Sequence, residues 1–140
     1  MGKINVGRVL LGGLAAGLIL NFGEYLLNDR VLATQMAELF RKCGFPRPGT
    51  NFIVIAVVIT FVLGIVIVLG YAAIRPRFGP GPKTAMIAGL FAWFGVVVYN
   101  NVIVVGLGME PTSVFTLVLC WELVEYLLAA IIGAWLYQEA

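Results

Sequence analysis

The sequence predicts an all-α integral membrane protein built as a bundle of four transmembrane helices, and three observations lead to this fold class. Of the 140 residues, 61% are hydrophobic and only 11% are charged, whereas soluble chains contain roughly 45–50% and 25%. Four apolar stretches reach the ~20 residues that a helix needs to cross a bilayer. Clusters of Pro and Gly separate these stretches. We therefore expect a single integral membrane domain that comprises residues 1–140.

The four predicted spans follow one another with short connections. The first starts close to the N-terminus, as a signal peptide would, but no small-residue cleavage site follows and the apolar pattern continues to Leu27. We interpret it as an uncleaved span. Small residues four apart, as in Gly13-x-x-x-Gly17 and Ala129-x-x-x-Gly133, are expected where helices touch. The predicted spans are residues 6–27, 52–74, 84–107 and 113–137.

A shorter helix is expected in the connection between the first two spans. Such an amphipathic helix can lie on the membrane surface or under a partner protein, or it can cap the bundle, which is the interpretation we favour. Apolar residues recur on one face at helical spacing and polar residues fill the other. The apolar set is Leu32, Met36, Leu39, Phe40 and Cys43, and the polar set is Gln35, Glu38, Arg41 and Lys42.

The distribution of Lys and Arg predicts the orientation in the membrane, because cytoplasmic loops carry an excess of both. The N-terminal segment and the second loop carry five of these residues and the first loop carries four. This difference favours cytoplasmic termini, and its small size leaves a dual topology open. Trp135 and Tyr137 are expected to be anchors at the membrane interface. The second loop is also a candidate contact for anionic lipid headgroups, although a topology anchor is the simpler role. Its three basic residues are Arg75, Arg77 and Lys83.

Polar residues inside the predicted spans are the strongest functional signal, because ionisable groups are costly in lipid and mark ion or substrate pathways. At about 1.5 Å of rise per residue, each helix brings something polar to the same half of the membrane. Two acids, Glu122 and Glu125, share one face of the fourth span. The candidate intramembrane polar or ion site comprises Glu24, Glu122, Glu125, Asn21, Asn100, Asn101 and Thr60.

Two interpretations of these acids remain open. No Lys or Arg lies in the apolar spans to pair with them, so neutral carboxyl groups can hydrogen-bond Asn100, Asn101 or Thr60 and hold the bundle together. Alternatively, the acids can bind a proton, a metal ion or a small organic cation. Oxygen ligands of this kind suit Mg²⁺, Ca²⁺ or Mn²⁺ better than transition metals, but no metal ligand set is assigned.

The composition argues against several other classes of protein. There is no His, which is the commonest general base, transition-metal ligand and haem ligand. The two cysteines fall in a loop and in a span, so neither a disulfide nor a thiolate site is expected. No nucleophile–base pair, phosphate-binding loop or metal motif occurs. We therefore predict no enzyme and no cofactor. The net charge of +2 is too small to indicate a nucleic-acid partner.

Residues 71–84, with the run Tyr-Ala-Ala-Ile-Arg-Pro-Arg-Phe-Gly-Pro-Gly-Pro, resemble a group of small, uncharacterised bacterial membrane proteins. Residues 12–28 and 129–137 are similar to the same group, so the likeness covers most of the chain. It implies a bacterial four-span protein of the inner membrane, and it implies no activity, cofactor or catalytic residue. The small multidrug transporters, which have four short helices with an essential acid in the first, offer an analogy without a shared motif.

We therefore expect a small multi-pass protein of the bacterial inner membrane whose partners are the lipid bilayer and either copies of itself or larger membrane-protein subunits. The first hypothesis is a non-enzymatic accessory or interaction subunit, because the chain is short and carries little chemistry. The alternative is a small proton- or cation-coupled transporter or channel that uses Glu24, Glu122 and Glu125, because these acids are expected at one level without counter-ions.

Overall fold

The structure is a computed structural model that describes residues 3–139, and it confirms the all-α bundle. Over these residues it contains helices and no strand. Four helical segments are long and apolar enough to cross a membrane, namely Val6–Val31, Thr50–Phe78, Pro82–Gly106 and Thr112–Leu136. The elements are α1 (Val6–Tyr25), η1 (Leu26–Val31), α2 (Ala33–Cys43), α3 (Thr50–Phe78), α4 (Pro82–Trp93), η2 (Phe94–Val98), α5 (Tyr99–Gly106) and α6 (Thr112–Leu136).

The first span ends in a wider, π-helical turn, η1, and the third span is interrupted by another, η2. The second span runs further than predicted, because the helix continues through Pro76 to Phe78. A proline in a helix removes one backbone donor, and here that loss falls in the last turn. Gly79, at φ 81°, then ends the helix in a backbone conformation that favours glycine.

The connection between α3 and α4 is tight and internally bonded. The Thr84 hydroxyl donates to the Gly79 carbonyl oxygen at 2.7 Å, and the Gly81 amide donates to the Tyr71 hydroxyl at 3.2 Å. Thr84 and Tyr71 are both buried. These contacts give the Arg-Pro-Arg-Phe-Gly-Pro-Gly-Pro segment a structural role, since they fix the angle between the second and third spans.

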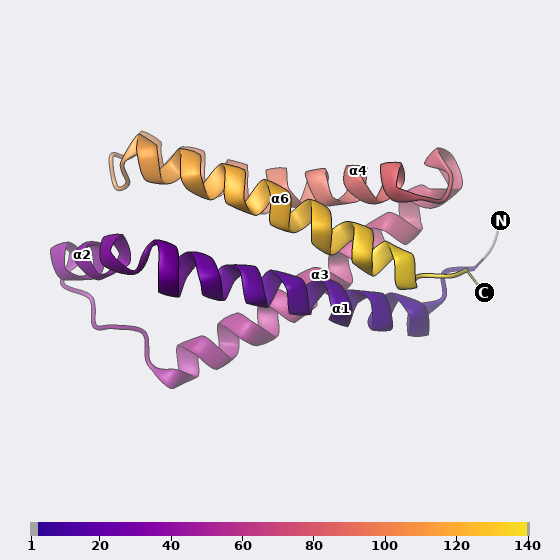
Figure 1. Cartoon of the computed structure of the whole chain (residues 1–140), viewed down its shortest axis with the longest axis horizontal. Coiled ribbons are helices and arrows are strands. Elements are labelled where there is room, and N and C mark those ends of the chain that lie inside the picture. The colour runs from indigo at the N-terminus through magenta and orange to yellow at the C-terminus, as the bar shows by residue number, and fades with distance from the viewer. Residues whose placement is uncertain (1–2, 140) are drawn as a thin grey trace.

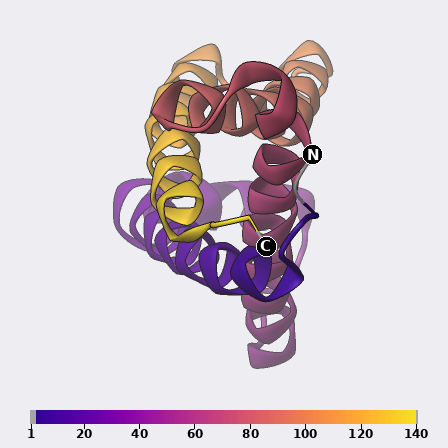
Figure 2. The same ribbon diagram turned by 90° about the vertical axis from the view of Figure 1, so that its right-hand side faces the viewer.

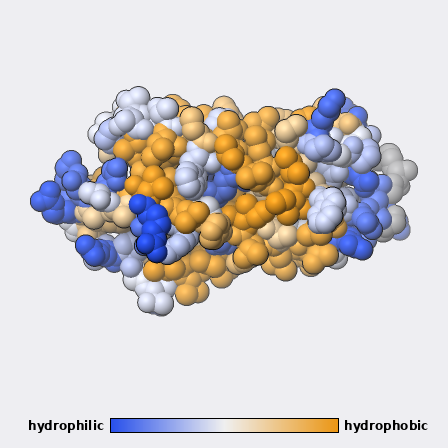
Figure 3. Space-filling view, in the orientation of Figure 1, coloured by the Kyte–Doolittle hydropathy of each residue, from blue (hydrophilic) through white to orange (hydrophobic). Residues whose placement is uncertain are grey.

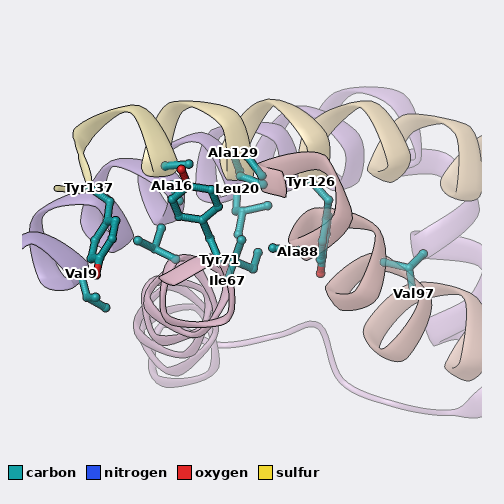
Figure 4. Packing of buried hydrophobic residues seen from close by; sticks show 14 of the residues in the cluster. Val9, Ala16, Leu20, Ile67, Tyr71, Ala88, Val97, Tyr126, Ala129 and Tyr137 are labelled. Carbon is teal, nitrogen blue, oxygen red and sulfur yellow. The ribbon is translucent and has the colours of Figure 1, made fainter. Parts of the chain in front are cut away.

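Helix α1 packs against α3 and α6, and α4 packs against α6 and α3 (Figures 1 and 2). Glycines permit the closest approaches. A Cβ atom at Gly13 would overlap the backbone of Ile65, and one at Gly12 would overlap the Gly133 carbonyl oxygen. Small residues at contacts are typical of membrane helices, because lipid provides no hydrophobic drive for association. Around them the core is assembled from small, aliphatic and aromatic side chains such as Ala16, Leu20, Tyr71, Ala129 and Tyr137 (Figure 4).

The first half of α3 diverges from the other helices (Figure 1). Its second half is buried against the bundle at Gly64, Ile67 and Val68. In the first half, by contrast, apolar side chains on every face are exposed. These are Phe52, Ile53, Val54, Ile55, Val57, Val58 and Ile59.

The face of the molecule seen in Figure 3 is mostly apolar along its middle and hydrophilic at both ends. Both termini lie near one end of the bundle and α2 lies at the other (Figure 1). This pattern fits a multi-pass membrane protein, since apolar side chains face hydrocarbon while charged side chains remain in water.

The predicted amphipathic helix is present as α2. None of its residues is fully buried, but Met36 and Leu39 line a shallow pocket together with Met109 and Glu110 of the connection between α5 and α6 and with Val114 of α6. Gly44, at φ 68°, ends the helix, with the Phe45 amide donating back to the Phe40 carbonyl at 3.0 Å. This is the common glycine-terminated helix end.

Candidate functional site

Three of the predicted acids come together where α1 runs antiparallel to α6. Glu122 and Glu125 lie one turn apart on α6, with only 8% and 5% of their surface exposed. Glu24, on α1, is half-buried. The carboxyl groups of Glu24, Glu122 and Glu125 lie close enough to interact electrostatically. We call these three residues the carboxyl cluster.

Gly23 positions the cluster, and the sequence analysis did not identify it. A Cβ atom at this position would overlap the carboxyl group of Glu125, so only glycine lets α1 approach α6 with the acid in its present place. The signal in the sequence was weak, because glycine is frequent in membrane helices for packing reasons alone.

Glu125 is the most deeply buried member of the carboxyl cluster and is incompletely hydrogen-bonded. Its Oε2 atom accepts from the Trp121 indole nitrogen at 3.1 Å. Its Oε1 atom is buried and has no hydrogen-bond partner. Glu24, nearer the surface, accepts from the Asn28 side-chain amide at 2.8 Å. A buried oxygen without a partner carries a desolvation cost, so Glu125 is chemically poised to take a proton or a cation.

Four asparagines of the spans donate to a carbonyl four residues earlier in their own helix, and among them only Asn28 also bonds an acid of the cluster, the Glu24 carboxyl group. Such bonds are an alternative to side-chain networks for short polar residues. Thr60 is half-buried, and no hydrogen bond joins it to the acids within the described residues. The donor–acceptor pairs are Asn21 with Gly17 at 2.8 Å, Asn28 with Glu24 at 3.0 Å, Asn100 with Val96 at 2.7 Å and Asn101 with Val97 at 2.9 Å.

Asn100 and Asn101 directly follow η2 in the chain. The carbonyl groups to which they donate, those of Val96 and Val97, lie in this wider turn. Asn21 makes a second, longer contact of 3.4 Å to the Val57 carbonyl oxygen of α3. Of the seven predicted site residues, the structure therefore brings together Glu24, Glu122 and Glu125. It uses the amides mainly to satisfy backbone carbonyls.

No basic side chain among residues 3–139 forms an ion pair with the carboxyl cluster. The two ion pairs in this part of the chain are Arg30 with Asp29 at 3.6 Å and Arg75 with Glu139 at 3.1 Å. Over the same residues, no group of three or more acidic, His or Cys side chains is arranged to hold a metal ion. The cluster thus presents negative charge or protons without a protein counter-ion.

The aromatic residues near the acids differ in role. Trp93 donates to the Leu119 carbonyl oxygen at 3.2 Å and joins the third span to α6. Tyr126 is buried beside the cluster.

The two predicted interfacial anchors lie at the other end of the bundle. Trp135 is 80% exposed, as an interfacial anchor would be, but the expectation for Tyr137 was wrong. Tyr137 is buried and meets the Tyr71 ring edge-to-face, with centroids 5.9 Å apart.

The predicted headgroup contacts divide in the structure. Arg77 and Lys83 are exposed. Arg75 turns inward, where it pairs with Glu139 and lies 5.6 Å from the centre of the Tyr137 ring. The chain itself thus occupies the Arg75 guanidinium, which leaves Arg77 and Lys83 as the basic residues that face outward in this loop.

Comparison of the chain with protein-family models, curated proteins and solved structures finds no match. The function is therefore argued from the chemistry of the carboxyl cluster.

Proposed function

We propose that the protein is a small proton- or cation-coupled transporter or channel of the bacterial inner membrane, and that Glu24, Glu122 and Glu125 bind the ion. The observation that carries the proposal is the burial of Glu122 and Glu125 on α6, which packs against α1, with Glu24 of α1 near enough to interact electrostatically and no basic partner. The proposal involves the binding and movement of an ion and no covalent step.

The hydrogen bonds favour an ion site over a purely structural role. If the acids served as neutral glue, the buried members would be expected to bond the amides of Asn100 and Asn101. Those amides bond their own helix, and Glu125 Oε1 has no partner. A structural network with unsatisfied members is less stable than an apolar core. A site that exchanges its occupant, by contrast, needs acceptor atoms that no protein group bonds permanently.

The place of the cluster in the bundle also favours exchange. It lies in the half of the molecule from which α3 diverges, near the level where Asn21 contacts Val57. At the other end, the close contacts of Gly12 with Gly133 and of Gly13 with Ile65 hold the helices together. Access to the acids is therefore easier from one side, as a carrier requires at each stage of its cycle.

Proton and cation flux in reconstituted vesicles tests the proposal. Proteoliposomes containing a pH-sensitive dye would be given outward gradients of Na⁺, K⁺, Mg²⁺ or methylammonium in turn. We expect the wild type to move protons with one of these gradients. Glu122→Gln/Glu125→Gln should abolish the movement, because Gln has the shape of a protonated Glu and cannot ionise.

Glu38→Gln is the matched control, since Glu38 is an exposed acid on α2, outside the cluster. It should leave the flux unchanged. Equal flux through the wild type and the double variant, or no flux through the wild type under any gradient, contradicts the proposal.

A second candidate function is that of a non-enzymatic accessory subunit, and the divergent half of α3 favours it. Residues 52–59 present apolar side chains on all faces and lack neighbours from this chain on most of them. A larger membrane-protein subunit or a second copy can pack there. Purification from native membranes in mild detergent tests this role, and a protein recovered only as a monomer contradicts it.

A further inference from the structure

A groove on the outside of the bundle leads to the carboxyl cluster from the lipid side. It lies between α1 and α6 and has a volume of about 320 Å³, at the lower end of the range for small-molecule sites, ~300–1,000 Å³. Phe22, Val124 and Leu128 form its rim and are 63%, 58% and 49% exposed. Its other lining residues include Gly23, Trp121 and Glu125.

The floor of the groove is polar at one point. Glu125 lines the groove with only 5% of its surface exposed. Its Oε1 atom is buried and has no hydrogen-bond partner. Trp121 holds the other carboxyl oxygen at 3.1 Å. Hydrocarbon chains of lipid cannot satisfy the free oxygen, so a ligand that carries a donor and a positive charge is favoured over lipid at this position.

The surroundings complement a cation with an apolar body. No basic side chain in residues 3–139 pairs with the carboxyl cluster, and the basic residue Arg30 is held by Asp29 and Tyr25. Phe22 and Trp121 add aromatic rings, whose faces attract cations. Val124 and Leu128 offer aliphatic surface to the remainder of the ligand.

We propose that this groove binds a lipophilic ammonium ion that enters from the bilayer, with its N–H donating to the carboxyl group of Glu125 and its hydrocarbon part lying along Phe22, Val124 and Leu128. The inference rests on the proposed function and specifies its substrate class. When Glu125 is protonated, binding of the ammonium ion releases that proton. Because the carboxylate binds either the proton or the ammonium ion, binding of one is coupled to release of the other.

Binding to the protein in phosphatidylcholine nanodiscs tests the inference. The probes are 4-phenylbutylamine and the neutral 4-phenylbutan-1-ol, and calorimetry would measure each against empty nanodiscs. We expect saturable binding of the amine and none of the alcohol. Glu125→Gln should weaken amine binding roughly tenfold or more, because it removes a charge-assisted hydrogen bond.

Two matched pairs of variants locate the site. Glu38→Gln makes the same change at an exposed acid of α2, outside both the carboxyl cluster and the groove lining, and should keep amine affinity within about threefold. Val124→Trp fills the groove and should abolish binding. Leu117→Trp enlarges another exposed residue of α6 and should not. Val124 is itself exposed, so this variant is expected to fold even if Glu125→Gln does not.

The outcomes separate this inference from the proposed function. Equal binding of amine and alcohol, no binding of either, or amine binding unaffected by Val124→Trp overturns the groove site. If the vesicles move protons in a Glu-dependent manner without amine binding, the proposed function stands and the groove site fails. Saturable amine binding without any ion flux leaves the groove as a binding site and overturns transport.

Discussion

At the scale of single residues, the carboxyl cluster depends on a glycine. Most glycines of the spans are explained by helix packing, but Gly23 faces a side-chain carboxyl group and no helix backbone. The acids were predictable from sequence, because an ionisable group in an apolar run is conspicuous. The role of Gly23 was not predictable, since the sequence does not show which helix the acids face.

Gly23→Ala should destabilise the protein by about 1 kcal/mol, because the added methyl group displaces the Glu125 carboxyl from its hydrogen bond with the Trp121 indole. Gly70→Ala is the control, since a Cβ atom there meets nothing within 4 Å. That change should be neutral or stabilising by up to ~1 kcal/mol from the higher helix propensity of Ala. Thermal unfolding in detergent measures both, and equal behaviour of the two variants would show that Gly23 does not hold α1 against the acid.

At the scale of elements, the four spans were predictable and their packing directions only partly so. A helix that is apolar on every face carries no periodic signal for the side that is buried. Residues 52–59 of α3 are of this kind, and nothing in their pattern indicates that this half leaves the bundle. The helical turns η1 and η2 were equally hidden, because the residues of both turns continue the apolar pattern of an ordinary membrane helix or the polar pattern of its end.

Helix α2 shows the opposite case, because its apolar face was visible in the sequence and does face the bundle. Glu110 lies in the pocket beneath it, and Glu38 and Lys42 of α2 line the same pocket. Burial raises the pKa of the Glu110 carboxyl above its ordinary value of about 4.5. The docked state therefore binds a proton more tightly than the undocked state does, so docking is strongest at low pH and weakens as the pH rises through the raised value.

Hydrogen exchange of the α2 amides measures this effect once intrinsic exchange rates are subtracted. Protection of Ala33–Cys43 should fall as the pH rises from acid to neutral, by about threefold or less because Glu110 is partly solvated. Glu110→Gln should remove the dependence and keep the low-pH protection throughout. Glu38→Gln is the control, and a pH dependence that persists in Glu110→Gln assigns the effect to another group.

At the scale of the whole molecule, the two ends of the bundle differ. The end with the termini is closed by glycine contacts, the Tyr71–Tyr137 pair and the Arg75–Glu139 ion pair. The other end carries α2 and the divergent half of α3 (Figure 1). The carboxyl cluster lies between these two ends, where α6 packs against α1. If the protein moves ions, the direction in which this asymmetric bundle sits in the membrane decides from which side the acids are loaded.

Two cysteines make that direction measurable. Cys43 is exposed at the end of α2, away from the termini, whereas Cys120 lies within the apolar α6 span. The five basic residues of the N-terminal segment and second loop predict that the termini are cytoplasmic, so a membrane-impermeant maleimide should label Cys43 in intact cells. Cys43→Ser should abolish labelling, because Cys120 is out of reach of a polar reagent. If labelling requires permeabilised cells, the orientation is the opposite of the one predicted, whereas labelling of half the molecules in intact cells would mean that both orientations occur.

Because five basic residues stand against four, a substitution such as Arg77→Ala should shift the labelled fraction more readily than in a protein with a strong charge bias.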